Sequence, residues 1–156
     1  MEKDLTNWEK FDLAVLEGKA TWWQMELPSG DIFFGEAKPK ILGRSSSNFK
    51  KYQDFTELIH PIDYEKTMQA MRDHLEGKKD VYETVYRIEH KDGNYIKFYD
   101  CGKIVEKNQD KTSVAGFVLK LDEQKDMQEQ KESFKKMVTR EKPSLVDVIR
   151  RIKQSQ

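Results

Sequence analysis

The chain has 156 residues, enough for one domain with flanking segments and a core of its own. Its 28 basic and 28 acidic residues cancel, so the charge balance gives no basis for binding nucleic acid or an anionic membrane surface. There is no long apolar run, and the first residues lack the apolar stretch of a signal peptide, so we expect a soluble, cytoplasmic protein. The single cysteine, Cys101, rules out an internal disulfide and a cysteine-rich metal site, and we expect it to be an ordinary strand residue.

The first element along the chain is an amphipathic helix predicted over residues 4–17. Thr6 and Glu9 have the spacing of a capping box, and Gly18 suits the end of the helix. Its apolar side chains fall near one face, and they include Leu5, Trp8, Phe11 and Val15. This face must therefore pack against another surface.

A first hairpin follows, with strands at residues 21–27 and from residue 32 and a turn at residues 28–31. Alternation within the first strand places three apolar side chains on one side, those of Trp23, Met25 and Leu27. Beyond the hairpin the signals are short and broken. We expect brief helical turns over three stretches, residues 40–42, 49–52 and 55–59.

The clearest helix is predicted over residues 61–76. Pro61 suits the first helical position, Asp63 lies in the first turn where the helix dipole favours a negative charge, and Gly77 follows the end. We expect Asp63 to accept backbone N–H groups there. Its apolar stripe consists of Tyr64, Met68, Met71 and Leu75.

The most regular pattern lies in residues 81–105, which we interpret as two long strands joined by a tight turn. A period of two in the first strand indicates one buried face. A two-residue turn would mix apolar and polar faces. A three-residue loop at residues 91–93, with Gly93 in the left-handed conformation, instead pairs Ile88 with Ile96 and Tyr86 with Phe98.

A further strand is predicted over residues 113–121, and the composition then becomes highly charged. Asp122 is a suitable N-cap for a helix that runs to about residue 140. A thin apolar stripe of near-heptad spacing in this helix consists of Met127, Phe134 and Met137. Pro143 then breaks the chain before a last short amphipathic helix at residues 145–152.

The order of these elements, together with a series of short motifs, resembles the PAS fold. Within it, the chain is similar to the PAS and PAC segments that are typical of sensor histidine kinases. The matching motifs cover roughly residues 18–125 and are Trp23-Gln24-Met25, Ile41-Leu42-Gly43-Arg44, Leu58-Ile59-His60-Pro61-Ile62-Asp63, Tyr86-Arg87-Ile88, Lys91-Asp92-Gly93, Gly116 and Glu123-Gln124-Lys125. Two stretches depart from the family pattern: residues 108–111 lack its second Asp-Gly turn, and Lys120-Leu121-Asp122 replaces its aspartate-isoleucine-threonine.

This resemblance implies an α+β fold with a five-stranded antiparallel sheet. Short helices and one longer helix are expected on one face, with flanking helices at both ends. The chain then divides into an N-terminal flanking helix at residues 1–17, a PAS/PAC sensor domain at 18–125 and a charged helical extension at 126–156. The replaced aspartate and threonine are linked in the family to passing a signal into the exit helix.

The resemblance also implies a non-enzymatic sensory or interaction module in signal transduction. Such a module binds a small ligand or a protein partner and dimerises through its flanking helices. An alternative is the N-terminal sensor portion of a histidine kinase in a two-component phosphorelay, because residues 126–156 are too few for a kinase. A DNA-binding regulator is disfavoured by the neutral charge, although the last helix carries three basic residues. The expected partners are a second copy of the chain and a signalling protein or output domain.

A ligand pocket in this family lies between the inner sheet face and the long helix. Its candidate lining residues are Trp23, Met25, Tyr64, Met68, Met71, Tyr86, Ile96 and Phe98. The alternative is that these side chains simply fill the core. This alternative is favoured, because the stripe carries few polar groups that could orient a ligand. For the N-terminal helix, the apolar face meets either its symmetry mate in a homodimer or its own sheet.

Two histidines, His74 and His60, are candidates for cofactor binding or catalysis. Some PAS sensors bind haem through a histidine on the long helix, where this chain has His74, but a solvated histidine near the helix end is the favoured interpretation. No cofactor is the favoured expectation, with haem and non-covalent flavin left open; residues 44–49 contain no cysteine for covalent flavin chemistry. His60 is expected near the helix cap, and no nucleophile motif, glycine loop or zinc-ligand pairing suggests an enzyme.

Overall fold

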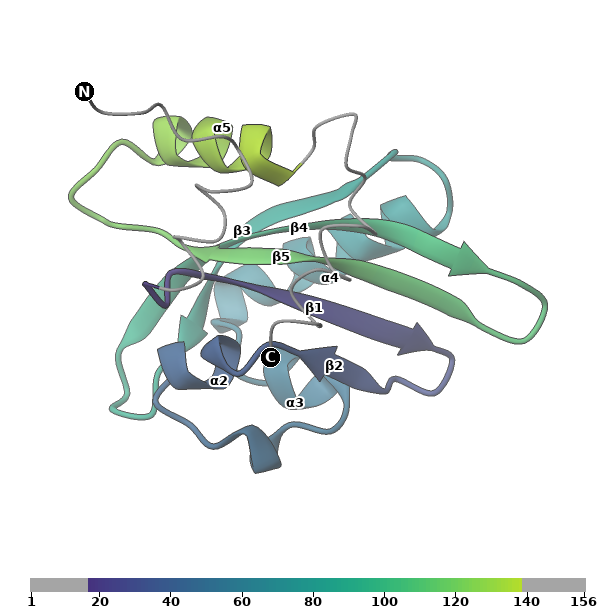
Figure 1. Cartoon of the computed structure of the whole chain (residues 1–156), viewed down its shortest axis with the longest axis horizontal. Helices are drawn as coiled ribbons and strands as arrows, with labels where there is room; N and C mark the ends of the chain where they lie inside the picture. The colour runs from purple at the N-terminus through teal and green to yellow at the C-terminus, as the bar shows by residue number, and fades with distance from the viewer. Residues whose placement is uncertain (1–16, 139–156) are drawn as a thin grey trace, which may run out of the picture.

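The computed structural model describes residues 17–138, which form one antiparallel sheet covered by helices on both faces (Figure 1). The sheet has five strands in the order β2-β1-β5-β4-β3. Their bounds are Ala20–Leu27 for β1, Ile32–Phe34 for β2, Tyr82–Glu89 for β3, Tyr95–Lys107 for β4 and Thr112–Lys120 for β5. The predicted α+β class and five-stranded sheet are therefore confirmed.

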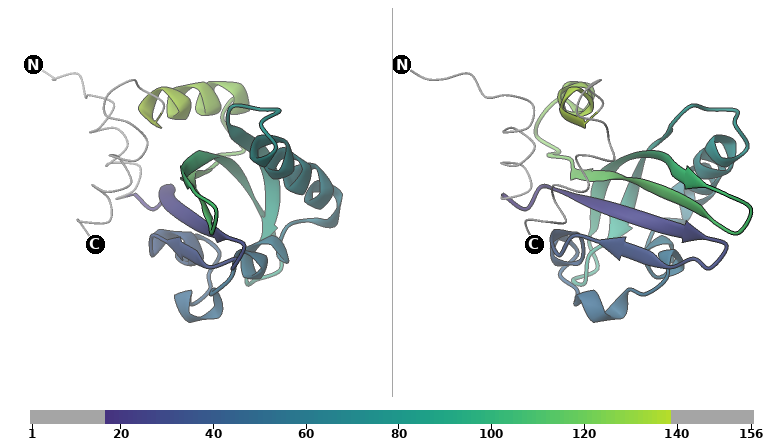
Figure 2. Two further views of the ribbon diagram at one scale, coloured as in Figure 1. Left: turned by 90° about the vertical axis from the view of Figure 1, so that its right-hand side faces the viewer. Right: turned by 45° about the vertical axis from the view of Figure 1, so that its right-hand side comes forward.

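The helices lie in two layers on opposite faces of the sheet. The inner face carries α2, α3 and α4, while α5 covers the outer face, as Figure 2 shows. Their bounds are Ala37–Ile41 for α2, Tyr52–Thr56 for α3, Pro61–Leu75 for α4 and Met127–Val138 for α5. The predicted helices at residues 4–17 and 145–152 lie outside the described residues.

The hairpin of β3 and β4 has the predicted register. Ile88 pairs with Ile96 and Tyr86 with Phe98, and Gly93 has a φ of 94° in the connecting loop. The glycine is required there because side chains rarely adopt this left-handed conformation. The period of two in the sequence therefore predicted which side chains face the inner core.

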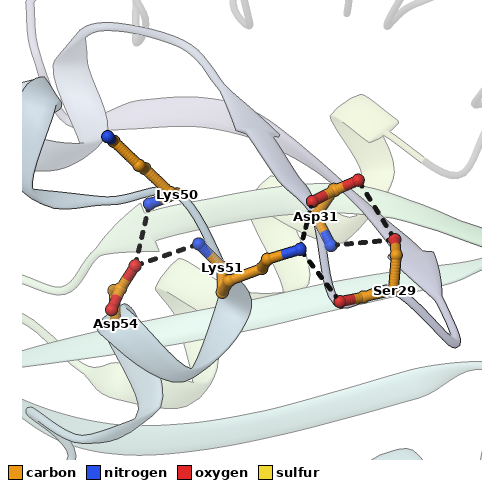
Figure 3. A network of polar contacts seen from close by, with 5 residues as sticks. All are labelled: Ser29, Asp31, Lys50, Lys51 and Asp54. Carbon is orange, nitrogen blue, oxygen red and sulfur yellow. Dashed lines mark hydrogen bonds and ion pairs between the residues drawn. The ribbon is translucent and has the colours of Figure 1, made fainter.

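The first hairpin is tied to the segment that leads into α3 (Figure 3). Lys51 donates to Asp31 Oδ1 at 2.6 Å and to the Ser29 carbonyl at 3.1 Å. Asp54 Oδ2 accepts the backbone N–H groups of Lys50 and Lys51 at 2.8 and 2.9 Å. These bonds hold the β1–β2 turn against the start of α3, so the short helices form a fixed wall over the inner face.

The short helices begin and end at positions that differ from those predicted. Besides α2 and α3, a single 3₁₀ turn spans Ser46–Asn48. The Ser45 hydroxyl accepts the Ser47 N–H and starts this turn within a run of three serines at residues 45–47. Side-chain hydrogen bonds of this kind, more than apolar spacing, set the bounds of such short elements.

The exit helix α5 begins later than predicted. Asp126 accepts the Glu129 N–H at 2.8 Å and is therefore the N-cap, whereas Asp122 accepts the Gln124 N–H in a turn before the helix. The buried residues of α5 are Phe134 and Val138, while Met127 is exposed. Of the predicted stripe, Phe134 therefore lies in the core, and the partly buried Met137 packs against that core.

Candidate functional site

A cavity of about 210 Å³ lies between the inner face of the sheet and the helices α2, α3 and α4. The helix α4 is fixed over this cavity from its start, because His60 donates its backbone N–H to the Arg87 carbonyl of β3. The cavity is lined by Trp23, Met25, Leu27, Ile32, Lys38, Tyr52, Phe55, Thr56, Ile59, Thr67, Met68, Met71, Arg72, Leu75, Tyr82, Tyr86, Ile88 and Asp100. Most of this lining is apolar, so its few polar groups decide what the cavity can bind.

A buried carboxylate, that of Asp100 on β4, lies at the sheet side of the cavity. Its Oδ1 accepts from Trp23 Nε1 at 2.7 Å, and its Oδ2 accepts from the Tyr86 and Tyr82 hydroxyls at 2.8 and 3.4 Å. Burial raises the pKa of Asp100 to about 6. The three donors act in the opposite direction, because they stabilise the ionised form of this carboxylate.

Two facing glycines allow the close approach of β4 and β5 and of the Trp23 ring. Gly102 pairs with Gly116 across β4 and β5, and Trp23 pairs with Gly116 across β1 and β5. A Cβ at Gly102 would lie 2.9 Å from the Trp23 ring, and one at Gly116 would lie 1.9 Å from the Cys101 carbonyl oxygen. Only glycine fits at these positions, and this allows the indole to lie over the sheet and reach Asp100.

The second charged group in the cavity is the ammonium of Lys38 on α2. The residue is only 5% exposed, and its Nζ lies 4.0 Å from the centre of the Phe55 ring. Burial lowers the pKa of Lys38 to about 8, while the charge of Asp100 acts in the opposite direction. Within residues 17–138 its ammonium has no hydrogen-bond acceptor and no ion pair within 4 Å. The cation–π contact contributes about 2 kcal/mol or more in such a desolvated site, and the desolvation of the charge costs several kcal/mol.

A third polar group, the hydroxyl of Thr67 on α4, also has no partner. Thr67 is 1% exposed and its Oγ1 makes no hydrogen bond among the described residues. Arg72, one turn further along α4, contributes to the lining but donates to Gln69 and Glu65. Two buried polar side chains thus line one cavity with hydrogen-bonding capacity that the protein leaves unused.

The predicted pocket residues fall into two groups. Trp23, Met25, Met68, Met71 and Tyr86 line the cavity. The other three do not: Tyr64 is exposed, Phe98 is wholly buried in the packed core, and Ile96 is half-buried outside the lining. Lys38, Thr67 and Asp100 also line the cavity but were not predicted, because a single charged or hydroxyl residue normally indicates solvent exposure.

The rotation of α4 explains why Tyr64 points outward. Asp63 accepts from Arg87 Nε and Nη2 at 2.8 and 3.1 Å, and from the Arg87 backbone N–H at 2.9 Å. At the C-terminal end of α4, the His74 ring is hydrogen-bonded to the loop before β3 and to β4. These polar anchors turn the Asp63–Thr67–His74 face inward. The expected backbone N–H partner of Asp63 therefore comes from β3, not from its own helix.

The interpretation of His74 as a solvated histidine is wrong, since the residue is only 6% exposed. Its Nδ1 lies 2.9 Å from the Lys79 carbonyl oxygen and its Nε2 accepts the Ile104 N–H at 2.9 Å. Nδ1 therefore carries the proton, since a carbonyl can only accept. His60, as expected, caps α4: its Nδ1 accepts the Ile62 N–H at 3.1 Å.

The outer face of β4 connects the same strand to the exit helix. Tyr99, next to Asp100 but on the opposite face, packs edge-on against Phe134 of α5 with ring centres 6.1 Å apart. Its hydroxyl donates to Glu83 at 2.6 Å, and Lys135 of α5 lies 3.3 Å from the same carboxylate. Cys101 is buried in this outer core, and burial raises the pKa of its thiol, which fits an ordinary strand residue.

No group of three or more histidine, cysteine, aspartate or glutamate side chains in residues 17–138 could hold a metal ion. In the same part of the chain, no helix has the length and apolar character needed to span a membrane.

The sheet order, the helices on its inner face and the exit helix on its outer face define the class of sensor domains found in signalling proteins. The family model described as the PAS fold matches residues 32–118, more than half of the chain. The chain belongs to this family.

Solved structures with the same fold come from signalling proteins. The N-terminal domain of a diguanylate cyclase with PAS/PAC sensor from Marinobacter aquaeolei is 23% identical, with a TM-score of 0.59 over 65% of this chain and 94% of that one. A sensory box histidine kinase/response regulator from Burkholderia thailandensis E264 is 20% identical, with a TM-score of 0.60 over 95% of this chain and 100% of that one. At these identities the similarity establishes the fold alone. No curated protein matches the chain.

Proposed function

We propose that the chain is a non-enzymatic sensory module that binds a small molecule in the inner cavity and reports its presence through α5. The observation that carries this proposal is the buried ammonium of Lys38, which lines the cavity without a hydrogen-bond acceptor among the described residues. A buried charge is costly unless it is paired, so a cavity that keeps one is suited to a ligand that supplies the partner.

The size of the cavity favours a small metabolite over haem or flavin. About 210 Å³ lies below the roughly 300–1,000 Å³ of pockets that hold drug-sized ligands. Haem and flavin are larger still. Iron binding by Nε2 of His74 would also displace the Ile104 N–H that this nitrogen accepts. We therefore propose a ligand without a visible chromophore.

The output route is supported by the alternation of faces along β4. Asp100 faces the cavity, while its neighbour Tyr99 contacts Phe134 of α5. A ligand that moves Asp100 would change the packing of Tyr99, because successive strand residues point to opposite faces of one rigid backbone. The exit helix would carry this change to an output domain or partner of a two-component pathway, in a cytoplasmic dimer formed through the flanking helices. Within this proposal the chain is either a separate module or the sensor portion of a longer kinase.

Filling the cavity tests whether it is a binding space or packed core. Met68→Trp adds volume to the cavity lining, so we expect a loss of less than about 1 kcal/mol in the free energy of unfolding. The matched control is Phe98→Trp, at a wholly buried position outside the lining, where overpacking should cost about 1–3 kcal/mol. Urea unfolding followed by circular dichroism measures both. An equal or larger loss for Met68→Trp would show that no usable space exists.

A further inference from the structure

We infer that the cavity recognises a small monoanion with a short apolar chain, such as a short-chain carboxylate, and that Lys38 and Thr67 bind its anionic group. This inference rests on the proposed function, because it specifies the chemical class of ligand for the same cavity. Three observations support it: the donors that the protein leaves unused, the size and polarity of the remaining lining, and the hydrogen bonds that Asp100 already accepts.

The cavity contains hydrogen-bond donors that have no acceptor among the described residues. The Lys38 ammonium carries three N–H donors and lies over the ring faces of Phe55 at 4.0 Å and Trp23 at 6.0 Å. The Thr67 hydroxyl can donate a fourth hydrogen bond and is likewise unpartnered in the described structure. A carboxylate offers about four lone-pair sites, so it matches this donor set better than a single carbonyl.

Three charged residues line the cavity: the Arg72 guanidinium is ion-paired with Glu65, which leaves the Lys38 ammonium and the Asp100 carboxylate. Asp100 already accepts from Trp23, Tyr82 and Tyr86. A cationic ligand would therefore meet a carboxylate that is already engaged, whereas an anionic ligand would meet an ammonium that is not.

The cavity of about 210 Å³ is smaller than the pockets of roughly 300–1,000 Å³ that hold drug-sized ligands. Apart from Thr67 and Arg72, the lining at α4 is apolar, through Met68, Met71 and Leu75. A carboxylate with a chain of a few methylene groups fits both the volume and this apolar wall.

Three isosteric probes test the inference on the full chain: pentanoate, pentanamide and pentan-1-amine, each titrated by calorimetry and by nuclear magnetic resonance. We expect pentanoate to bind most tightly and pentan-1-amine most weakly. Lys38→Met should weaken pentanoate binding about 10- to 100-fold, the equivalent of one charge-assisted hydrogen bond, and leave pentanamide binding much less affected. The variant should fold, because it replaces a buried charge with an apolar side chain of similar length.

Two further variants control the result. Lys40→Met removes an exposed lysine from the same helix and should leave pentanoate binding unchanged. Thr67→Val deletes the unpartnered hydroxyl, and we expect weaker pentanoate binding with no loss of stability. Pentanamide or pentan-1-amine binding as tightly as pentanoate, or no effect of Lys38→Met, would overturn the anion specificity while leaving the cavity as a ligand site. Absence of binding by every probe would overturn the inference too. The free energy of unfolding of Met68→Trp then tests separately whether the cavity is a binding space.

Discussion

At the residue scale, the ion pair between the buried Asp63 and the half-buried Arg87 holds α4 in the orientation that forms the cavity. The hydrogen bonds from the Arg87 side chain are the main reason that the pKa of Asp63 is lowered to about 2. A carboxylate whose pKa is lower in the folded state stabilises the fold above its unfolded pKa of about 4. That contribution is lost as the pH falls from about 4 towards 2.

Asp63→Asn should therefore destabilise the protein by about 1–3 kcal/mol at pH 7, because it leaves the Arg87 guanidinium without its charged partner. The difference between wild type and variant should shrink as the pH falls through 4 towards 2. Urea unfolding across this range measures it, with Asp110→Asn at an exposed turn as the control. A variant within about 0.5 kcal/mol of wild type at pH 7 would contradict the assigned role.

At the scale of elements, the side-chain amide of Gln130 attaches α5 to the segment that follows β5. Its Nε2 donates to the Asp122 carbonyl at 2.8 Å, and its Oε1 accepts the Asp122 N–H at 2.8 Å. These two hydrogen bonds fix Asp122, the last residue of the segment Lys120-Leu121-Asp122 that replaces the usual family residues. The coupling of sheet and exit helix in this chain is thus supported by a residue from the helix itself.

Gln130→Ala should loosen α5 without unfolding the sheet. Loss of two backbone contacts, each contributing about 1 kcal/mol, predicts a roughly 5- to 30-fold faster amide exchange in residues 127–138. Hydrogen–deuterium exchange followed by mass spectrometry measures this rate. Gln128→Ala, which removes only an exposed contact to Glu132, is the control. Equal protection in the two variants would show that Gln130 does not anchor the helix.

The elements also differ in how far the sequence could predict them. The β3–β4 hairpin was predictable with its register, because alternation and the Gly93 turn are local signals. The rotation of α4 was not, because it depends on Asp63 and His74 bonding to distant strands. The N-cap of α5 at Asp126 was missed because Asp122, an equally suitable residue, is used in a turn.

The site was less predictable than the fold. Five of the eight predicted lining residues were found because apolar periodicity identifies the inner face of β1, β3 and α4. The polar residues that give the cavity its chemistry carry no such signal. Lys38 lies in a helix of five residues, with Lys40 exposed two positions later, so only the three-dimensional structure distinguishes the buried lysine from the exposed one.

At the scale of the whole molecule, the central claim is that this PAS domain holds a small colourless ligand between its sheet and α4. Native mass spectrometry of the freshly purified chain, with a visible absorption spectrum, tests it most directly. We predict a small-molecule adduct on a dimer, no Soret or flavin band, and loss of the adduct in Met68→Trp. A bare polypeptide for both proteins, or a chromophore spectrum, would contradict the claim, and a monomer mass would contradict dimerisation through the flanking helices.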